Sequence, residues 1–201
     1  MNVRHGFIGG YATSLIGGAR ITTDIDLIID GDPKTLQTQL VENCEDFTMS
    51  SQNKLHFQSG IHTVTIEMLR GGGERQLKLP DPKTVELVEL APRSRPGRVE
   101  STFMPVVTPS ILLITKIKRW YFVEESSRPE SKHKAKRDVI DIVVLLKWLS
   151  MNELKIDLGG YKSKPKEQLV PMFRRLYGKT DDLRLYLEQT LEKDDLDAIK
   201  N

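Results

Sequence analysis

The sequence predicts an α+β (α/β) fold, in which a mixed β-sheet flanked by helices is followed by a helical C-terminal half. Three observations support this prediction. Alternating β-branched segments gather before residue 70, glycine and proline interrupt residues 71–101, and amphipathic segments follow from residue 108 onward. We therefore expect two regions, a sheet region over residues 1–105 and a helical region over residues 106–201.

Four segments of the first region have the apolar and polar alternation of β-strands. They are Phe7-Ile8, Asp24–Ile29, Leu55–Phe57 and Thr63–Leu69. After the second strand, Asp32 is a typical N-cap and Pro33 a typical first residue for a helix that runs to Val41. A shorter helix is expected over Lys83–Leu90. Strands that alternate with helices in this order predict a sheet on which the helices pack.

The second region has the periodicity of amphipathic helices, and Thr108-Pro109 is a typical helix start. The four expected helices cover Ser110–Val123, Ser131–Leu149, Pro165–Leu176 and Asp181–Leu191. Gly159-Gly160 interrupts the pattern between the second and the third. The acidic segment Glu188–Asp197 is expected to keep the chain soluble or to cap a helix.

The charge of the chain is nearly balanced, since 30 Lys and Arg face 28 Asp and Glu, and the total of +2 favours no polyanionic partner. The distribution is uneven. Residues 1–100 hold 11 basic and 13 acidic side chains, whereas residues 101–201 hold 19 and 15. Two segments, residues 115–137 and residues 162–184, are strongly basic and are either solvated helix faces or a surface for the end of an RNA or tRNA.

Cysteine content and hydropathy indicate the compartment. The single cysteine, Cys44, excludes an internal disulfide framework and fits a reducing environment. No apolar run approaches the ~20 residues that a membrane-spanning helix needs, and the N-terminal sequence lacks the pattern of a signal peptide. We expect a cytoplasmic protein with no membrane partner.

Three carboxylates have a pattern typical of a site for a hard cation. Asp24 and Asp26 lie two residues apart on a predicted strand, so both side chains leave the same face. They can share a cation such as Mg²⁺, or they can be two solvated acids at a strand end. Glu67 lies on the polar face of a later strand and adds a third carboxylate.

A double glycine precedes these acids. Gly9-Gly10 follows the first strand and opens a helical stretch, which allows the backbone to approach a polyphosphate and directs helix N–H groups toward it. Strand-borne carboxylates combined with a glycine turn of this kind are typical of phosphoryl transfer.

Several segments carry a resemblance to a known family. They are Ile8-Gly9-Gly10-Tyr11-Ala12, Arg20-x-Thr22-x-Asp24-Ile25-Asp26-Leu27, Thr65-Ile66-Glu67, Lys116-Ile117-Lys118 and Lys136-Arg137-Asp138-x-x-Asp141-Ile142. In this order they resemble the motifs of the nucleotidyltransferase fold, the DNA polymerase β superfamily, and within it the minimal AbiEii toxin-type branch. The resemblance covers about residues 5–150.

The resemblance implies roles for individual residues. The residues implied to bind the nucleotide phosphates are Gly9, Gly10, Ser14, Arg20, Lys116 and Lys136, and those implied to be catalytic and metal-binding are Asp24, Asp26 and Glu67. Lys134 and Arg137 are alternatives to Lys136, and Thr13 is an alternative to Ser14. Arg20 has an alternative role as a brace for the aspartate strand. Asp138 and Asp141 either pair with neighbouring cations such as Lys134 and Arg137 or belong to the site.

The implied activity is Mg²⁺-dependent nucleotidyl transfer, with Mn²⁺ as a substitute metal. An NMP would pass from an NTP to a hydroxyl of an RNA or tRNA end, a protein or a small molecule, with release of pyrophosphate. The alternative is a catalytically inactive protein of the same fold that binds a nucleotide, RNA or a protein partner. Three mutually repelling carboxylates favour the enzyme over this alternative.

Overall fold

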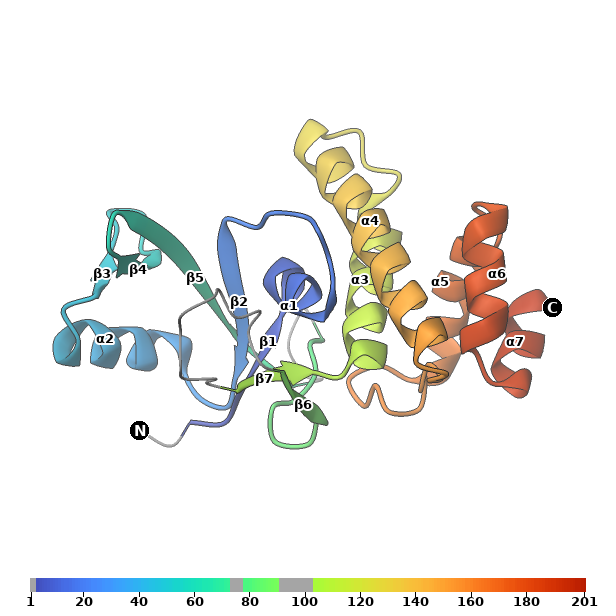
Figure 1. The fold of residues 1–201 in the computed structure, drawn as a ribbon, viewed down its shortest axis with the longest axis horizontal. Helices are drawn as coiled ribbons and strands as arrows, with labels where there is room; N and C mark the ends of the chain where they lie inside the picture. The colour runs from blue at the N-terminus through green and yellow to red at the C-terminus, as the bar shows by residue number, and fades with distance from the viewer. Residues whose placement is uncertain (1–2, 73–77, 91–102) are drawn as a thin grey trace. The chain divides into compact units, whose positions relative to one another are not determined.

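The computed structural model describes residues 3–72, 78–90 and 103–201. The chain divides into two compact units, shown in Figure 1. One comprises the chain up to Leu15 together with Ala19–Val107, and the other comprises Ile16–Gly18 together with Thr108–Asn201.

One mixed sheet forms the first unit, and it contains seven strands within the described residues. The strands are β1 (His5–Ile8), β2 (Asp24–Ile29), β3 (Phe47–Met49), β4 (Leu55–Ser59), β5 (His62–Arg70), β6 (Leu87–Leu90) and β7 (Met104–Val107). Their spatial order is β3-β4-β5-β2-β1-β7-β6. The pairs β2–β5 and β1–β7 are parallel and the others are antiparallel. The expected α+β fold with a mixed sheet is confirmed.

Two helices follow the first two strands, α1 (Gly9–Ile16) after β1 and α2 (Pro33–Asn43) after β2. The start of α2 is the one expected from the sequence. The Asp32 carboxylate accepts a hydrogen bond from the Thr35 backbone N–H at 2.9 Å, and Pro33 lies in the first turn. This bond to the exposed carboxylate lowers the pKa of Asp32.

The helix α2 packs on one face of the sheet through a small apolar core. Ile29, Leu55 and Met68 are buried, and Leu36, Leu40 and Val41 of α2 pack against this cluster. Successive strand residues point to opposite faces, so this core lies on the side opposite to Asp26 and Glu67. Packing by α2 therefore leaves the carboxylate face of β2 and β5 uncovered by that helix.

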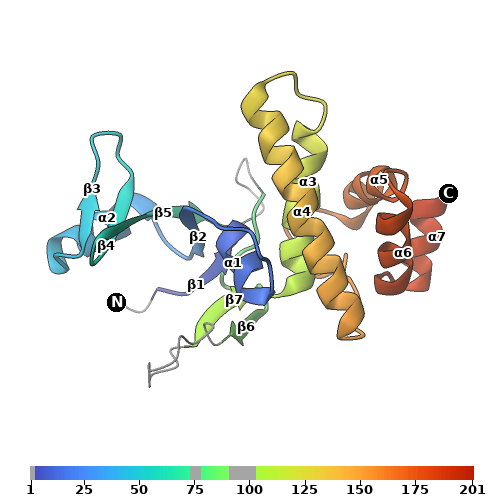
Figure 2. The same cartoon turned by 45° about the horizontal axis from the view of Figure 1, so that its top comes forward.

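Helices alone form the second unit. They are α3 (Pro109–Val123), α4 (Pro129–Met151), α5 (Lys166–Tyr177), α6 (Asp181–Thr190) and α7 (Lys193–Lys200). The helices α3 and α4 lie side by side in both views of the ribbon (Figures 1 and 2). Their shared core contains fully buried aliphatic side chains, among them Ile114, Ile117, Ile142 and Leu145. The first four helices confirm the expected ones to within a few residues at each end.

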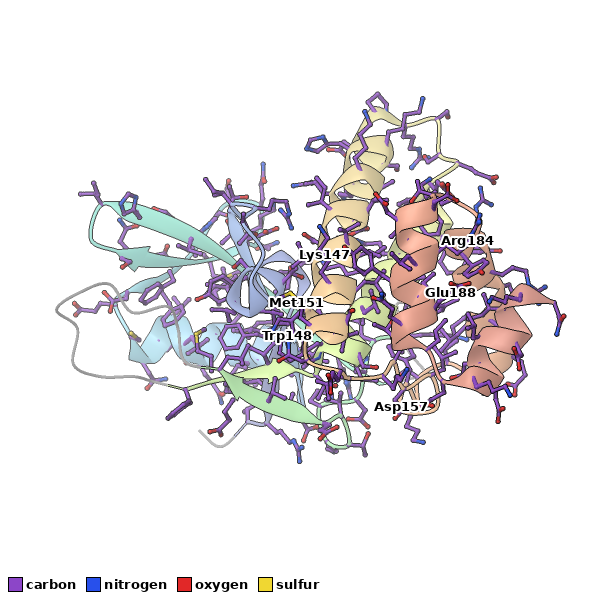
Figure 3. All side chains as sticks on the ribbon, turned by 45° about the vertical axis from the view of Figure 1, so that its right-hand side comes forward. Lys147, Trp148, Met151, Asp157, Arg184 and Glu188 are labelled. Atoms are coloured by element: carbon purple, nitrogen blue, oxygen red, sulfur yellow. The ribbon has the colours of Figure 1, made fainter. Side chains whose placement is uncertain are left out.

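Aromatic rings and charged side chains join the last helices. Lys147 of α4 lies over the ring of Tyr186 on α6, with 5.8 Å from Nζ to the ring centroid. Figure 3 shows Arg184 and Glu188 along α6. The Tyr177 hydroxyl of α5 donates to Glu188 at 2.6 Å, and the Arg184 guanidinium lies 5.4 Å from the same ring.

One expectation about local structure differs from the observed fold. The helix expected over Lys83–Leu90 is wrong: the Asp81 carbonyl closes a single turn with the N–H groups of Thr84 and Val85, and β6 then pairs with β7. The acidic segment Glu188–Asp197 spans the end of α6 and the start of α7, and Glu192 within it is the N-cap residue of α7. Asp195 of this segment is buried and pairs with Lys166 of α5.

Candidate active site

The carboxylates of the predicted site lie on the paired strands β2 and β5. Asp26 pairs in register with Glu67, and Asp24 pairs with Thr65. Residues in register on parallel strands share a face, so Asp24, Asp26 and Glu67 leave the same side of the sheet. Asp24 and Glu67 are exposed, whereas Asp26 is partly buried. The alternation in the sequence therefore places these three residues on one face of the sheet.

The Asp26 carboxylate lies against bare backbone at the start of α1. Gly9 has a φ of +73°, in the left-handed region that favours glycine. A Cβ at this position would overlap Asp26 Oδ2 and would lie 2.6 Å from its Cγ. Glycine at position 9 is therefore required both by the backbone conformation and by the space that Asp26 occupies.

Arg20 lies against the second glycine. A Cβ on Gly10 would overlap Arg20 Nη2 and would lie 3.3 Å from Thr22 Oγ1. Arg20 Nη1 also donates to the Ile21 carbonyl at 3.4 Å. The guanidinium thus lies beside the glycine turn at the N-terminus of α1, where backbone N–H groups favour an anion.

Thr22 has a direct contact with one of the aspartates. Its hydroxyl lies 2.7 Å from Asp24 Oδ1 and 3.0 Å from the Asp24 carbonyl oxygen, with donor geometry toward both. Thr22 is not among the site residues predicted from the sequence. Its place in the same short motif as Arg20 and both aspartates is the sequence feature that points to a role in the site.

The hydroxyl groups of α1 bond to the helix itself. Ser14 Oγ donates to the Tyr11 carbonyl at 2.7 Å, and Thr13 Oγ1 donates to the Gly9 carbonyl at 3.0 Å. The resemblance predicts a phosphate contact by Ser14. To donate a hydrogen bond to a phosphate, the Ser14 hydroxyl would have to give up its bond to the Tyr11 carbonyl. Ser14 stays a predicted nucleotide-binding residue.

The donor set fits a divalent cation that completes its shell with substrate. In residues 3–72, 78–90 and 103–201, no three His, Cys, Asp or Glu side chains lie close enough to hold a metal together. Mg²⁺ in phosphoryl-transfer sites is commonly bound by one or two carboxylates, substrate phosphates and water. Asp24 and Asp26, beside a glycine turn suited to phosphate, match that arrangement.

The predicted Lys116 belongs to the helical unit. Its side chain is 2% exposed, its Nζ donates to Asp141 Oδ2 at 2.7 Å, and Asp138 Oδ1 lies 3.9 Å away. Arg119 Nε donates to Asp138 at 2.8 Å. Both aspartates of α4 thus pair with cations of α3, and not with Lys134 or Arg137. A phosphate contact by Lys116 would have to compete with Asp141.

The buried Lys116–Asp141 pair gives a prediction for stability. Burial lowers the pKa of Lys116 from 10.5, although Asp141 opposes this shift. Asp141→Asn should destabilise the fold by about 3 kcal/mol at pH 7, because the ammonium stays buried after its partner charge is removed. The pKa of Lys116 then falls further below 10.5, so the unfolded state binds more protons and stability rises with pH.

Urea unfolding at pH 7 and at pH 10 checks this prediction. The difference in the free energy of unfolding between Asp141→Asn and the wild type should be smaller at pH 10 than at pH 7. Asp197→Asn, a change at an exposed position of α7, is the matched control and should leave stability nearly unchanged. Equal stability of Asp141→Asn and the wild type would show that the pair contributes nothing net.

The two basic segments differ in how their charges are used. In residues 162–184, Arg175 donates to Glu124 and Glu125 at 2.7 Å each, and Lys179 pairs with Glu124. By contrast, the exposed basic side chains at the start of α4 form no ion pair within the described parts of the chain. They are Arg128, Lys132, Lys134 and the predicted Lys136.

No helix among the described residues combines the length and the apolar character that crossing a bilayer requires.

Comparison with known proteins connects these features to a family. Residues 7–199 match the family described as "Nucleotidyl transferase AbiEii toxin, Type IV TA system". No curated protein matches the chain significantly.

One solved structure shows the same fold. An antigenic nucleotidyltransferase-like protein from Paracoccidioides brasiliensis has 22% identity and a TM-score of 0.72, and the match covers 97% of this chain and 88% of that one. The antibiotic-resistance factor ANT(2'')-Ia is a more distant match, with 16% identity, a TM-score of 0.34, and coverage of 75% and 84%. The extent of the family match, which spans both the sheet and the helices, establishes that the chain belongs to the AbiEii nucleotidyl transferase family and is a nucleotidyltransferase by class.

Proposed function

We propose that the protein transfers an NMP from an NTP to a hydroxyl acceptor in a reaction that depends on Mg²⁺, with Mn²⁺ as a substitute. The observation that carries this proposal is the packing of the Asp26 carboxylate against Gly9, with Asp24 and Glu67 on the same face of the sheet. This packing supports the proposal, because it brings a carboxylate that could hold a cation next to a backbone suited to phosphate.

Each residue of this group has a role in the proposal. Gly9 and Gly10 admit the triphosphate to the N-terminus of α1, and Arg20 adds a positive charge beside it. Asp24 and Asp26 would hold the cation. When bound, the cation would lower the pKa of the attacking hydroxyl and neutralise charge on the phosphates.

The chemical step is an in-line substitution at phosphorus. The acceptor oxygen forms a bond to the α-phosphorus, the bond from that phosphorus to the bridging oxygen breaks, and pyrophosphate leaves. The acceptor proton passes to a carboxylate, for which we propose Glu67, because it is exposed and is paired in register with Asp26.

Transfer assays test this proposal directly. The protein is incubated with each labelled NTP, Mg²⁺ or Mn²⁺, and total RNA, tRNA or cell extract, with Asp26→Asn in parallel. We expect label on an acceptor with the wild type and none with the variant. Absence of transfer to RNA, to the protein itself and to every extract component would contradict the enzyme proposal.

We further propose that the acceptor is the end of an RNA or tRNA. The support for this is the exposed basic start of α4, where Lys132 and Lys136 lie four residues apart on one helix face and Arg128 is the N-cap residue. A stripe of this kind suits phosphate contacts along a nucleic-acid backbone. Residues 162–184 contribute less to this proposal, because Arg175 and Lys179 already pair with carboxylates.

Charge reversal on this stripe is expected to weaken RNA binding. Lys132→Glu combined with Lys136→Glu should lower the affinity for a labelled RNA at least tenfold. The slope of log K against log salt should fall by about 0.7 for each phosphate that the variant no longer neutralises. Fluorescence anisotropy at several salt concentrations measures both quantities.

Lys54→Glu combined with Lys193→Glu is the matched control for this experiment, since it makes the same change of charge at exposed positions elsewhere. Equal RNA affinity of the α4 variant and this control would show that the basic residues at the start of α4 form a solvated helix face and do not bind RNA.

The alternative function is nucleotide or RNA binding without catalysis. Nucleotide binding without label transfer under any metal would support it. We place either activity in the cytoplasm, because the free thiol of Cys44 fits a reducing compartment.

A further inference from the structure

The hydrogen bond from the Thr22 hydroxyl to Asp24 has no role in the function proposed above. Thr22 lies two residues before Asp24, the first residue of β2, and its Oγ1 lies 2.7 Å from Asp24 Oδ1. Within the described residues, no other side chain donates a hydrogen bond to the Asp24 carboxylate. Asp24 is exposed at the first position of its strand, so packing does little to restrict its rotamers.

A hydroxyl bonded to an ionised carboxylate reduces this freedom. The bond is charge-assisted and therefore stronger than a bond between neutral groups. With Oδ1 accepting from Thr22, Oδ2 is the atom with no protein hydrogen bond within the described residues. Residues that orient a metal ligand in this way typically change metal affinity or activity 10- to 100-fold when they are replaced.

The location of Thr22 connects it to the phosphate end of the site. Its Oγ1 lies 3.3 Å from the point that a Cβ on Gly10 would occupy, beside the Arg20 guanidinium. The hydroxyl therefore contacts Asp24 and borders the glycine turn at the same time.

We propose that Thr22 is a positioning residue, whose hydroxyl holds Asp24 in the orientation that binds a divalent cation. This inference rests on the proposed function, because it takes Asp24 as a cation ligand. Thr22 acts through Asp24 and contacts neither the cation nor the reacting atoms.

The test measures cation binding with no turnover. Mn²⁺ is titrated into the wild type, Thr22→Val and Thr22→Ser without nucleotide, and free Mn²⁺ is measured from its EPR signal. Thr22→Val keeps the shape and removes the hydroxyl, so we expect Mn²⁺ affinity to fall by about 10- to 100-fold. Thr22→Ser keeps the hydroxyl and should bind nearly as the wild type does.

Thr23→Val is the matched control, because it makes the same change at the next residue, which is exposed and makes no side-chain hydrogen bond to a described residue. It should leave Mn²⁺ affinity unchanged. Thr22→Ala, which has no branched side chain, replaces Thr22→Val if the valine variant fails to fold. Thermal unfolding of each variant without metal reports on the fold.

The outcomes separate this inference from the proposed function. Unchanged Mn²⁺ affinity in Thr22→Val, or no Mn²⁺ binding by the wild type, overturns the positioning role. Loss of affinity in Thr22→Val with recovery in Thr22→Ser supports it, even if no nucleotidyl transfer is found with any NTP. Normal transfer by the wild type with unchanged Mn²⁺ affinity in Thr22→Val would overturn the inference and leave the proposed function intact.

Discussion

Asp26→Asn should lower the rate of nucleotidyl transfer by about 1,000-fold or more while the fold is retained. Asparagine has nearly the same shape as aspartate, so it fits the space beside Gly9, but it lacks the negative charge that binds a cation. Loss of cation-based charge stabilisation costs several kcal/mol in the transition state, and each 1.36 kcal/mol is about a tenfold change in rate. Single-turnover transfer with labelled NTP measures this effect.

Two further measurements make the Asp26 result interpretable. Thermal unfolding of the variant shows whether the fold is retained, so that a loss of activity can be separated from a loss of structure. Asp46→Asn makes the same substitution at an exposed position away from these carboxylates and should transfer normally. Full activity of Asp26→Asn would show that Asp26 is not a catalytic residue.

Gly9→Ala should abolish transfer and also destabilise the first unit. The substitution places a Cβ in the space occupied by the Asp26 carboxylate, and it forces alanine to adopt a φ of +73°. A left-handed conformation costs a non-glycine residue about 1–2 kcal/mol, and displacement of Asp26 adds to this cost. Chemical unfolding together with the transfer assay measures both effects.

The chain supplies a matched control for Gly9→Ala. Gly60 also has a positive φ, of +60°, but a Cβ there would meet nothing within 4 Å. Gly60→Ala should therefore show the backbone cost alone, with transfer intact. If the two variants were equally active, the contact between Gly9 and Asp26 would not matter for catalysis.

The local parts of this structure could be predicted from the sequence. Apolar periodicity predicted α3 and α4, with Pro109 at the start of α3, and alternation predicted β2 and β5. Alternation also indicated that Asp24, Asp26 and Glu67 share a face, because the direction of a side chain follows from its parity along a strand.

The remaining parts depend on contacts that no local pattern contains. Residues Leu87–Leu90 were predicted to be helical, and they form a strand because β7 pairs with them. The partners of Asp138 and Asp141 were sought on their own helix, whereas Lys116 and Arg119 reach them from α3. The placement of Arg20 against Gly10 likewise depends on the path of the chain between α1 and β2.

The parallel pairing of β1 with β7 has a consequence for how the protein is made. Phe7, just before the double glycine, pairs with Val106, at the end of the sheet unit. The glycine turn and both aspartates are synthesised early. The strand β7, which borders β1 on the side opposite to β2, is synthesised only about a hundred residues later. Pairings of this kind close a long loop and form late in folding. We expect the catalytic sheet to assemble only once synthesis has passed Val107, so that a stalled nascent chain would have no transferase activity.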